Sequence, residues 1–289
     1  MVTNAKKSSW KKGYIIAREK IKVIIENKII QKPIFFTRIY IDYMPSLPTY
    51  SIIAPAHNEE GNIEKFLLRV IGIIRTNKLS AEIIAIDDVS SDSTGKIMDK
   101  ISDKFPLLRI IHRGSHNGPG NAERAGFAVA KGKWIITLDS DLSHRPEEIP
   151  NFIAAANRGY DMIIGSRFVP GGDMDGPAFR LLLSRACAFA AKLITGYPLQ
   201  DASSGFRIMR AAALKTLNLQ SPWFEIHTEI PIKFFLHGYK VGEIPIRYQR
   251  RGEGQSKLTI FQSIPKYLGI MMKERIKKLM KNPEYKNRK

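Results

Sequence analysis

The chain has 289 residues and a formal net charge of +19 at pH 7, and 44% of its residues are hydrophobic and 25% charged. This composition supplies enough apolar side chains for a folded core, which excludes a fully disordered protein. A single cysteine, Cys187, excludes a disulfide framework and a zinc site built on cysteines.

The positive charge is concentrated at the two ends of the chain. Residues 1–45 carry a net charge of +7 and residues 257–289 carry +8, whereas residues 46–256 carry only +4. We therefore expect a basic N-terminal extension over 1–45, a central globular domain over 46–257, and a basic helix with a tail over 258–289. Basic terminal segments of this kind indicate a polyanionic partner, either nucleic acid or anionic lipid.

Both basic ends interleave apolar residues with lysine. In residues 14–30 the apolar residues are mainly Ile and Val, and in residues 258–280 they include Phe, Tyr and Met. This pattern is typical of an amphipathic helix in a membrane interface, and a helix packed on the protein's own core is the alternative. The basic residues lack the aromatic spacing of a stacking platform, so we expect no nucleic-acid partner. No stretch reaches the roughly 18 uninterrupted apolar residues of a spanning helix.

The central domain alternates short apolar runs with helical patterns, and after residue 170 longer helices dominate. This order predicts an α/β fold with a doubly wound, mostly parallel sheet and helices on both faces. Strands buried on both faces should be continuous apolar runs, as these are. The predicted strands are 49–54, 82–86, 107–111, 134–138, 161–165 and one later strand at 241–246, and the predicted helices are 62–75, 94–105, 118–131 and one that begins at Pro146.

Acidic clusters follow three of the predicted strands. Residues 55–60 contain Glu59 and Glu60, residues 87–93 begin with two aspartates, and Asp139 and Asp141 flank Ser140. Ligands of doubly wound sheets bind beyond the carboxyl ends of the strands, so these clusters should meet at one edge. Carboxylates that lie close together repel each other, which predicts a cation among them.

The Asp139-Ser140-Asp141 segment is the sharpest of these signals. Its hard oxygen ligands suit Mg²⁺ or Mn²⁺ bridging a diphosphate, whereas an isolated segment of this kind is often a polar turn. Asp87 and Asp88 can cap the following helix or accept hydrogen bonds from a base or ribose, and both roles can hold together. The sequence contains no P-loop, no dinucleotide-binding glycine motif after the first strand and no nucleophile elbow of a hydrolase.

These segments carry a resemblance to a known family. Residues 51–59, 82–94 and 138–147 resemble family 2 glycosyltransferases of GT-A fold. Residues 165–172, 183–185, 201–207, 242–246 and 254–258 are similar to polyprenyl-phosphate mannose synthases, the dolichol-phosphate mannosyltransferases. The resemblance covers about residues 49–258, with every motif in order.

The resemblance implies roles for particular residues. It implies catalytic roles for Asp141, Arg167 and Arg251, with Asp139 and Asp141 as metal ligands. The tyrosine and glycine usual in the family are replaced here by His57 and Val89, which leaves the base preference open. The implied nucleotide-sugar contacts are Pro55, His57, Glu59, Ile86, Asp88, Asp139, Ser140, Asp141, Arg167, Arg251 and Lys257, and the implied acceptor-phosphate contacts are Arg180, Ser184, Arg185 and Arg207.

The resemblance also implies an activity: inverting transfer of mannose from GDP-mannose onto a dolichyl or other polyprenyl phosphate, with Mg²⁺ or Mn²⁺ as cofactor. Donor and acceptor are both anions, and a metal with several arginines offsets their repulsion. The acceptor phosphate is already ionised at pH 7, so no strong general base is needed. Asp201 is the nearest candidate for a base, and we expect a structural or positioning role for it.

Alternatives remain open at this stage. The donor can instead be UDP-glucose or another UDP-sugar, with the same acceptor. A non-catalytic GT-A membrane adaptor is a further alternative, against which the intact Asp139, Asp141 and Arg251 argue. We expect a peripheral protein on the cytoplasmic face of the plasma membrane or endoplasmic reticulum, where it meets an anionic surface and where a separate membrane anchor subunit is a candidate partner.

Overall fold

The computed structural model of the chain describes residues 47–175, 178–198, 200–249 and 260–280. The side chains of Ala178, Arg180 and residues 260–263 are outside this description, although their backbone belongs to helices. The predicted N-terminal extension, 1–45, and two predicted site residues, Arg251 and Lys257, also lie outside the described residues.

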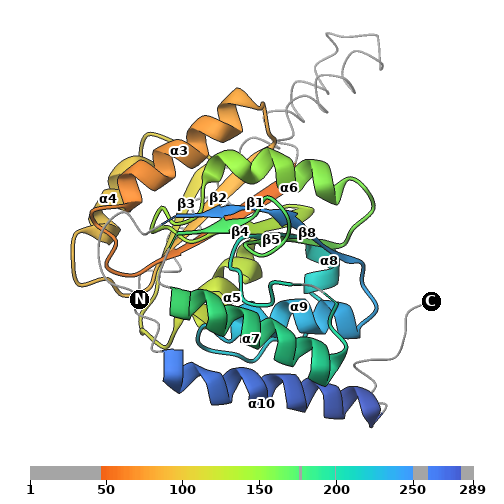
Figure 1. Cartoon of the computed structure of the whole chain (residues 1–289). Coiled ribbons are helices and arrows are strands. Elements are labelled where there is room, and N and C mark those ends of the chain that lie inside the picture. Colours follow the sequence, from red (N-terminus) through yellow and green to blue (C-terminus); the bar gives the residue numbers. More distant parts are fainter. Residues whose placement is uncertain (1–46, 176–177, 199, 250–259, 281–289) are drawn as a thin grey trace, which may run out of the picture. The chain divides into compact units, whose positions relative to one another are not determined.

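A seven-stranded sheet forms the centre of the fold (Figure 1). The strand order is β3-β2-β1-β4-β7-β5-β8, and β7 alone among these strands runs antiparallel to its neighbours. The mostly parallel, doubly wound arrangement predicted from the sequence is therefore confirmed. The strands are β1 (Tyr50–Ala56), β2 (Ala81–Asp87), β3 (Leu108–His112), β4 (Trp134–Thr137), β5 (Met162–Ser166), β7 (Arg207–Arg210) and β8 (Val241–Pro245).

Helices cover both faces of this sheet (Figure 1). On one face lie α3 (Ile63–Thr76), α4 (Thr94–Ser102) and α6 (Ile149–Ala156), the last preceded by a 3-10 turn at Pro146–Glu148. On the other face lie α5 (Pro119–Val129), α7 (Ala178–Thr195), α8 (Ala211–Leu214), α9 (Ile226–Leu236) and α10 (Ile260–Leu279).

Alternate residues of each strand pack into the hydrophobic cores on the two faces of the sheet. Ile52 and Ala54 of β1 pack in the core under α3, and Ile53 between them packs in the opposite core. Ile83 and Ile84 of β2 divide in the same way, because successive side chains of a strand point to opposite faces. Each fully buried aliphatic side chain stabilises the fold by about 1.5–3 kcal/mol. The continuous apolar runs of the sequence therefore reflect burial on two sides.

The expectation of one strand after residue 170 is wrong. The structure adds β7 to the main sheet and a separate two-stranded ladder of β6 (Asp173–Met174) and β9 (Arg247–Tyr248). β7 reads Arg-Ile-Met-Arg, so its apolar run is too short to show a period. Because β7 is antiparallel, its first residue, Arg207, lies at the edge where the parallel strands end.

The C-terminal helix α10 packs on α7 and α9. Met271 of α10 is fully buried, and the carboxylate of Glu274 lies 3.8 Å from the ammonium group of Lys233 on α9. One face of α10 therefore packs on the core, which was the alternative to membrane contact. Leu268, Met272, Ile276 and Leu279 remain exposed on the same helix. Within the described residues, no helix has the length and apolar character needed to cross a membrane.

Candidate functional site

Three adjacent strands deliver the predicted site residues to one edge of the sheet. β1 lies between β2 and β4, with Ala56 opposite Asp87 and Ile53 opposite Thr137. The segments that follow these strands therefore begin side by side. His57 after β1, Asp88 after β2 and Asp139 after β4 therefore follow strand ends at one edge of the sheet, where the sequence predicted the acidic clusters.

The loops after β1 and β2 are held together by hydrogen bonds. The His57 Nδ1 atom donates to the backbone oxygen of Asp88 at 2.8 Å, and the Ser91 N–H donates to Asn58 Oδ1 at 2.8 Å. The backbone N–H of Glu59 donates to Thr94 Oγ1 at 2.8 Å. Asn58 has a φ of 54°, a left-handed conformation that asparagine tolerates better than most residues. The loop that presents His57 is therefore fixed from the neighbouring strand.

Three residues that were predicted to contact the nucleotide, Pro55, Glu59 and Ile86, lie in or beside this loop and support it. The side chain of Glu59 is buried and accepts a hydrogen bond from Asn62 Nδ2 at 2.8 Å. Pro55 and Ile86 are register partners in β1 and β2, and Ile86 is fully buried. Their nucleotide-binding roles stay predictions, because these contacts explain the three residues as supports of the loop.

Asp87 and Asp88 divide the two roles that the sequence left open. Asp87 accepts the Ser90 N–H at 3.0 Å and a hydrogen bond from His112 Nδ1 at 2.9 Å. Burial would raise the pKa of Asp87, but the bonds from Ser90 and His112 outweigh it and lower that pKa. Asp87 therefore organises the turn, and Asp88 contacts His57 through its backbone oxygen while its carboxylate faces Arg113 and His116.

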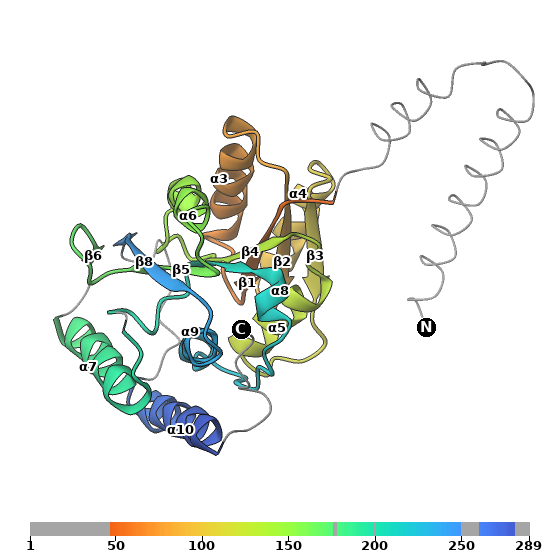
Figure 2. The ribbon, with the colours of Figure 1, turned by 90° about the vertical axis from the view of Figure 1, so that its right-hand side faces the viewer.

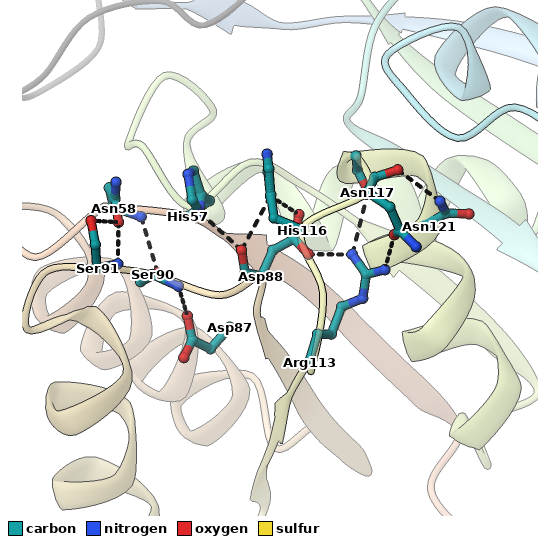
Figure 3. Close-up of polar contacts among 11 residues, drawn as sticks. His57, Asn58, Asp87, Asp88, Ser90, Ser91, Arg113, His116, Asn117 and Asn121 are labelled. Carbon is teal, nitrogen blue, oxygen red and sulfur yellow. Dashed lines mark hydrogen bonds and ion pairs between the residues drawn. The ribbon is translucent and has the colours of Figure 1, made fainter.

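Asp88 is surrounded by nitrogen donors (Figure 3). Arg113 Nη1 donates to Asp88 Oδ1, and His116 Nδ1 lies 2.8 Å from Asp88 Oδ2. The rings of His57 and His116 are stacked, with centroids 4.1 Å apart and an angle of 16° between their planes. The Asp88 side chain is only 3% exposed. Arg113 and His116 were missed from the sequence, because their loop gave only a turn signal before a helix.

Val89 shows why a glycine suits the position after Asp88. Its φ is 61°, in the left-handed region, and its side chain is exposed. A β-branched residue in this region is an outlier, whereas glycine adopts it without a steric cost. The departure from the family pattern at Val89 therefore introduces local backbone strain.

The Asp139-Ser140-Asp141 segment is tied to the sheet by its own side chains. Ser140 Oγ donates to the Pro55 carbonyl at 2.9 Å, and the Asp139 N–H donates to His144 Nδ1 at 3.2 Å. Burial lowers the pKa of His144 despite the nearby aspartates, so its imidazole stays neutral and can accept this bond. The Asp139 side chain is 35% exposed at the edge of the sheet.

The donor set of this segment fits a magnesium or manganese ion. Asp141 is largely buried, and its Oδ1 accepts hydrogen bonds from the Ser143 N–H at 3.0 Å and Ser143 Oγ at 2.5 Å. Among the described residues, no three His, Cys, Asp or Glu side chains are already placed to hold a metal. Mg²⁺ at phosphate sites commonly uses one or two protein carboxylates and takes its other ligands from phosphate and water. Asp139 and Asp141 match that requirement.

A second group of residues follows β5. Arg167 Nε donates to Asp201 Oδ2 at 2.8 Å, Arg167 Nη2 donates to Asp201 Oδ1 at 2.9 Å, and Asp201 is fully buried. Burial would raise the pKa of Asp201, but Arg167 more than offsets this and lowers it. The guanidinium groups of Arg167 and Arg185 lie 5.2 and 5.6 Å from the ring centroid of Phe168. The structure thus brings Arg167 and Arg185 together at one ring.

The remaining predicted acceptor residues divide between α7 and β7. Ser184 is half-buried on α7, the helix that also contributes the backbone of Arg180. Arg207 is fully buried, and its Nε and Nη2 atoms have no hydrogen-bond partner among the described residues. Burial lowers the pKa of Arg207, although Glu123, Asp139 and Asp201 oppose this. The acceptor role of Arg207 stays a prediction, since its guanidinium lies beneath the site surface.

A buried hydrogen-bonded pair beneath the site was also missed. His227 Nε2 donates to Glu123 Oε1 at 2.8 Å, and the two residues are 104 positions apart. A Cβ atom at Gly205 would lie 3.1 Å from His227 Cε1 and 3.2 Å from Asp139 Oδ1. Glycine at 205 thus leaves room for both the His227 ring and the Asp139 carboxylate. No local pattern in either helix could have predicted a pairing over this separation.

The chain is similar in sequence to known proteins. The family model described as Glycosyl transferase family 2 matches residues 51–217. Dolichol-phosphate mannosyltransferase of Pyrococcus furiosus is 34% identical over 218 residues, a match that covers 73% of this chain and 60% of that protein. Undecaprenyl-phosphate mannosyltransferase of Micrococcus luteus is 31% identical over 214 residues, which cover 72% of this chain and 86% of that protein.

Among solved structures, glucosyl-3-phosphoglycerate synthase from Mycobacterium tuberculosis, in complex with Mn²⁺, uridine diphosphate and phosphoglyceric acid, has a TM-score of 0.61 at 19% identity. That match covers 79% of this chain and 78% of the other. Identity at this level speaks for the fold alone, and the fold is of GT-A type. The matched family model spans more than half of the sequence and includes β1, β2 and β4 with the acidic segments that follow them, so the chain belongs to glycosyltransferase family 2.

Proposed function

We propose that this chain is an inverting glycosyltransferase that moves mannose from GDP-mannose onto a polyprenyl phosphate. The observation that carries the proposal is the meeting of His57, Asp88 and Asp139 at the ends of three adjacent strands. The names of relatives at about one-third identity support the substrate class, since they are mannosyltransferases that act on dolichol or undecaprenyl phosphate.

The donor would bind along this edge of the sheet. The nucleoside lies at His57 and Asp88, with Pro55, Glu59 and Ile86 supporting the loop, and the diphosphate lies at Asp139 and Asp141. Mg²⁺ or Mn²⁺ bound there supplies positive charge to the leaving diphosphate. The bond from Ser140 to the Pro55 carbonyl, at 2.9 Å, keeps the two halves of the donor site in register.

The acceptor would approach from the side of α7. Arg167, a proposed nucleotide-sugar contact, and Arg185, a proposed acceptor contact, both lie near the Phe168 ring, and guanidinium groups suit contacts to phosphate. Asp201 keeps Arg167 charged and oriented, and a carboxylate engaged in this way does not remove a proton from the acceptor. A phosphate oxygen already ionised at pH 7 attacks the anomeric carbon without a base. The other proposed acceptor-phosphate contacts are Arg180, Ser184 and Arg207, and Arg251 and Lys257 are proposed contacts of the nucleotide-sugar.

A membrane surface is the proposed location, on its cytoplasmic face. Exposed apolar side chains form one stripe on α7, with spacings of three, seven and four residues, and a second stripe on α10. The two helices lie side by side (Figure 2). Two adjacent amphipathic helices can enter the boundary of a bilayer that holds the acceptor. The stripes consist of Phe179, Leu182, Phe189, Leu193, Leu268, Met272, Ile276 and Leu279.

The test is a donor panel with the purified full-length chain. Dolichyl or undecaprenyl phosphate is supplied in vesicles with GDP-mannose, UDP-glucose or another UDP-sugar, with Mg²⁺, with Mn²⁺ and with a chelator. We expect mannosyl transfer from GDP-mannose that needs the metal. Transfer from a UDP-sugar instead would replace the donor assignment, and no transfer from any donor would favour the non-catalytic adaptor.

Asp139→Asn is the variant that tests the metal assignment. We expect metal-dependent transfer to fall by about 100-fold or more, because a lost ligand costs several kcal/mol at the leaving group. Asp103→Asn is the matched control, since Asp103 lies at the end of α4. The thermal midpoints of both variants should match that of the natural chain. Near-normal transfer by Asp139→Asn would remove Asp139 from the proposed metal site.

A further inference from the structure

The proposed nucleoside site already contains an aromatic ring from the protein itself. His116 stacks on His57 with ring centroids 4.1 Å apart, and its Nδ1 atom donates to the backbone oxygen of Asp88 at 3.2 Å and lies 2.8 Å from Asp88 Oδ2 (Figure 3). We propose that His116 occupies the place of the donor's nucleobase in the nucleotide-free protein and leaves that place when the donor binds. The inference rests on the proposed function, which assigns the nucleoside to His57 and Asp88.

The imidazole of His116 offers the two features by which this site would recognise a base. A nucleobase has a flat π-face that stacks on an aromatic ring, and it carries N–H groups that donate hydrogen bonds to a carboxylate. The planes of His57 and His116 differ by only 16°, which is a stacked pair and not an edge contact. The same ring also lies 2.8 Å from the carboxylate of Asp88, so one side chain occupies both the stacking position and the position beside the carboxylate.

The position cannot be shared between His116 and a base. The Asp88 side chain is 3% exposed, its Oδ1 accepts a hydrogen bond from Arg113, and its Oδ2 lies 2.8 Å from His116 Nδ1. Trp223 also contacts the His116 ring in an edge-to-face arrangement, with centroids 5.8 Å apart. A base that stacks on this face of His57 and reaches Asp88 Oδ2 must therefore take the place of the imidazole.

His116 is the member of this cluster that can move. Its side chain is 35% exposed, and Gly114 two residues earlier would meet no atom within 4 Å if it carried a Cβ. Arg113 is held more firmly: its backbone N–H donates to the Asp87 carbonyl at 3.0 Å, and its Nη2 atom donates to Asn117 Oδ1. The ring of His116 can thus rotate out while Arg113 keeps its bond to Asp88.

The contact between His116 and Asp88 stabilises the buried carboxylate and lowers the apparent affinity for nucleotide. A buried carboxylate without partners is strongly unfavourable, and His116 keeps Asp88 fully paired when no donor is bound. The apparent affinity for nucleotide falls in proportion to the fraction of molecules whose site is open. If the ring is in place about nine-tenths of the time, the apparent Kd is roughly tenfold weaker than that of the open site.

Titration calorimetry on the full-length chain with GDP and with UDP, in Mg²⁺, tests this inference. We expect His116→Ala to bind the preferred nucleotide about three- to tenfold more tightly than the natural chain, because its site is always open. His112→Ala is the matched control: His112 bonds to Asp87 at 2.9 Å in the same way, but outside the nucleoside site. Its affinity should equal that of the natural chain.

The histidine ring signals in ¹H–¹⁵N spectra give a second readout that does not depend on a variant's affinity. The six histidines can be assigned by single substitutions. Saturation with nucleotide should move the His116 signals to those of a solvated imidazole, and should leave the His112 signals in place. Unchanged His116 signals in the saturated protein would overturn the inference.

The outcomes separate this inference from the proposed function. Weaker binding by His116→Ala would mean that the ring contacts the bound base, which overturns the inference and leaves the nucleotide site intact. Unchanged binding by His116→Ala with weaker binding by Asp88→Asn overturns it as well. If neither Asp88→Asn nor His57→Ala alters nucleotide affinity, the proposed nucleoside site itself is wrong, and the inference fails with it.

Discussion

Asp201 has no exposed surface, and both of its carboxylate oxygens face the guanidinium of Arg167. Its backbone N–H donates to Glu243 Oε1 at 2.7 Å, so the pair is also fixed to β8. This geometry agrees with a positioning role for Asp201, the role expected from the sequence. A buried ion pair of this kind is costly to break, because removal of one partner leaves the other charged and unpaired.

We predict that Asp201→Asn lowers the free energy of unfolding by about 3–5 kcal/mol. Urea denaturation of the purified variant measures this. Asp161→Asn is the matched control, because its partner Arg210 is 46% exposed and such surface pairs contribute about 1 kcal/mol or less. Equal losses in the two variants would mean that the Asp201–Arg167 pair contributes no more than a surface pair.

For single residues, the sequence predicts the site residues that directly follow apolar runs, and it misses the residues that other loops bring to the site. Asp88, Asp139 and Asp141 were found because a strand end is visible as the end of an apolar run. Arg113 and His116 come from the loop after β3, 25 and 28 positions from Asp88. Which cation pairs with which carboxylate depends on strand order, and a single sequence does not contain that information.

Among the elements, β2, β3 and α4 are joined by one imidazole. His112 at the end of β3 donates from Nε2 to Asp99 of α4 at 3.0 Å and from Nδ1 to Asp87 of β2 at 2.9 Å. The bonds to Asp99 and Asp87 raise the pKa of His112 above its usual value. Since both ring nitrogens donate, the contact is strongest when the imidazole is protonated.

The stabilisation from His112 should therefore depend on pH. A raised folded-state pKa gives stability that is complete below the unfolded value of 6.5 and is lost as pH rises through the higher folded value. We predict that His112→Gln lowers the free energy of unfolding more at about pH 5.5 than at about pH 9. Urea denaturation at both pH values measures this. Asp99→Asn should show a similar pH-dependent loss, and a loss independent of pH in His112→Gln would contradict the assignment.

The exposed stripe of α10 leads to a prediction about membrane binding. Met272 and Ile276 are about half exposed, one turn apart, whereas Met271 beside them is fully buried. We predict that Met272→Asp with Ile276→Asp reduces flotation with anionic vesicles several-fold and leaves the thermal midpoint unchanged, because apolar insertion is lost without loss of core packing.

The control for that variant is Leu68→Asp, which changes an exposed leucine of α3 on the other face of the sheet. It should float like the natural chain. Equal flotation of the double variant and this control would remove the α10 stripe from the proposed membrane contact. A lowered thermal midpoint in the double variant alone would mean that the two side chains pack on the protein.

The sequence predicted secondary-structure elements correctly where a residue pattern is compatible with only one type of element. The strands near 50–56 and 81–87 are long apolar runs between turn residues, and both were found within two residues of their observed ends. β7 has only two apolar residues between two arginines, and it becomes a strand because β4 and β5 pair with it on both sides. Its existence is a tertiary effect, which is why the region after residue 170 was predicted less well.

For the whole molecule, the distribution of charge matters more than its sum. The charge of +19 is concentrated in the two ends, and the described C-terminal helix combines Lys273, Arg275, Lys277 and Lys278 with its exposed apolar stripe. Each basic residue near an anionic bilayer contributes about 1 kcal/mol of attraction, and salt screens this attraction.

We predict that the full-length chain floats with anionic vesicles at low ionic strength and is largely released at about 0.5 M salt, where the screening length is roughly 4 Å. Vesicles of neutral lipid at low salt are the control and should recover much less protein. Flotation that is equal on neutral and anionic vesicles, or that does not change with salt, would exclude the electrostatic contribution.

β4 is an interior strand only because β7 pairs along its second side, from Trp134 opposite Arg210 to Thr137 opposite Arg207. Asp88, Asp139 and Asp141 all precede residue 142, yet the strand that closes the sheet beside them begins at residue 207. A fragment or nascent chain that stops between these points would present the backbone of an apolar strand to its surroundings, and such open edges pair with other chains and aggregate. The donor half therefore contains its proposed ligands without being a separable module, and the later half of the chain protects it from self-association.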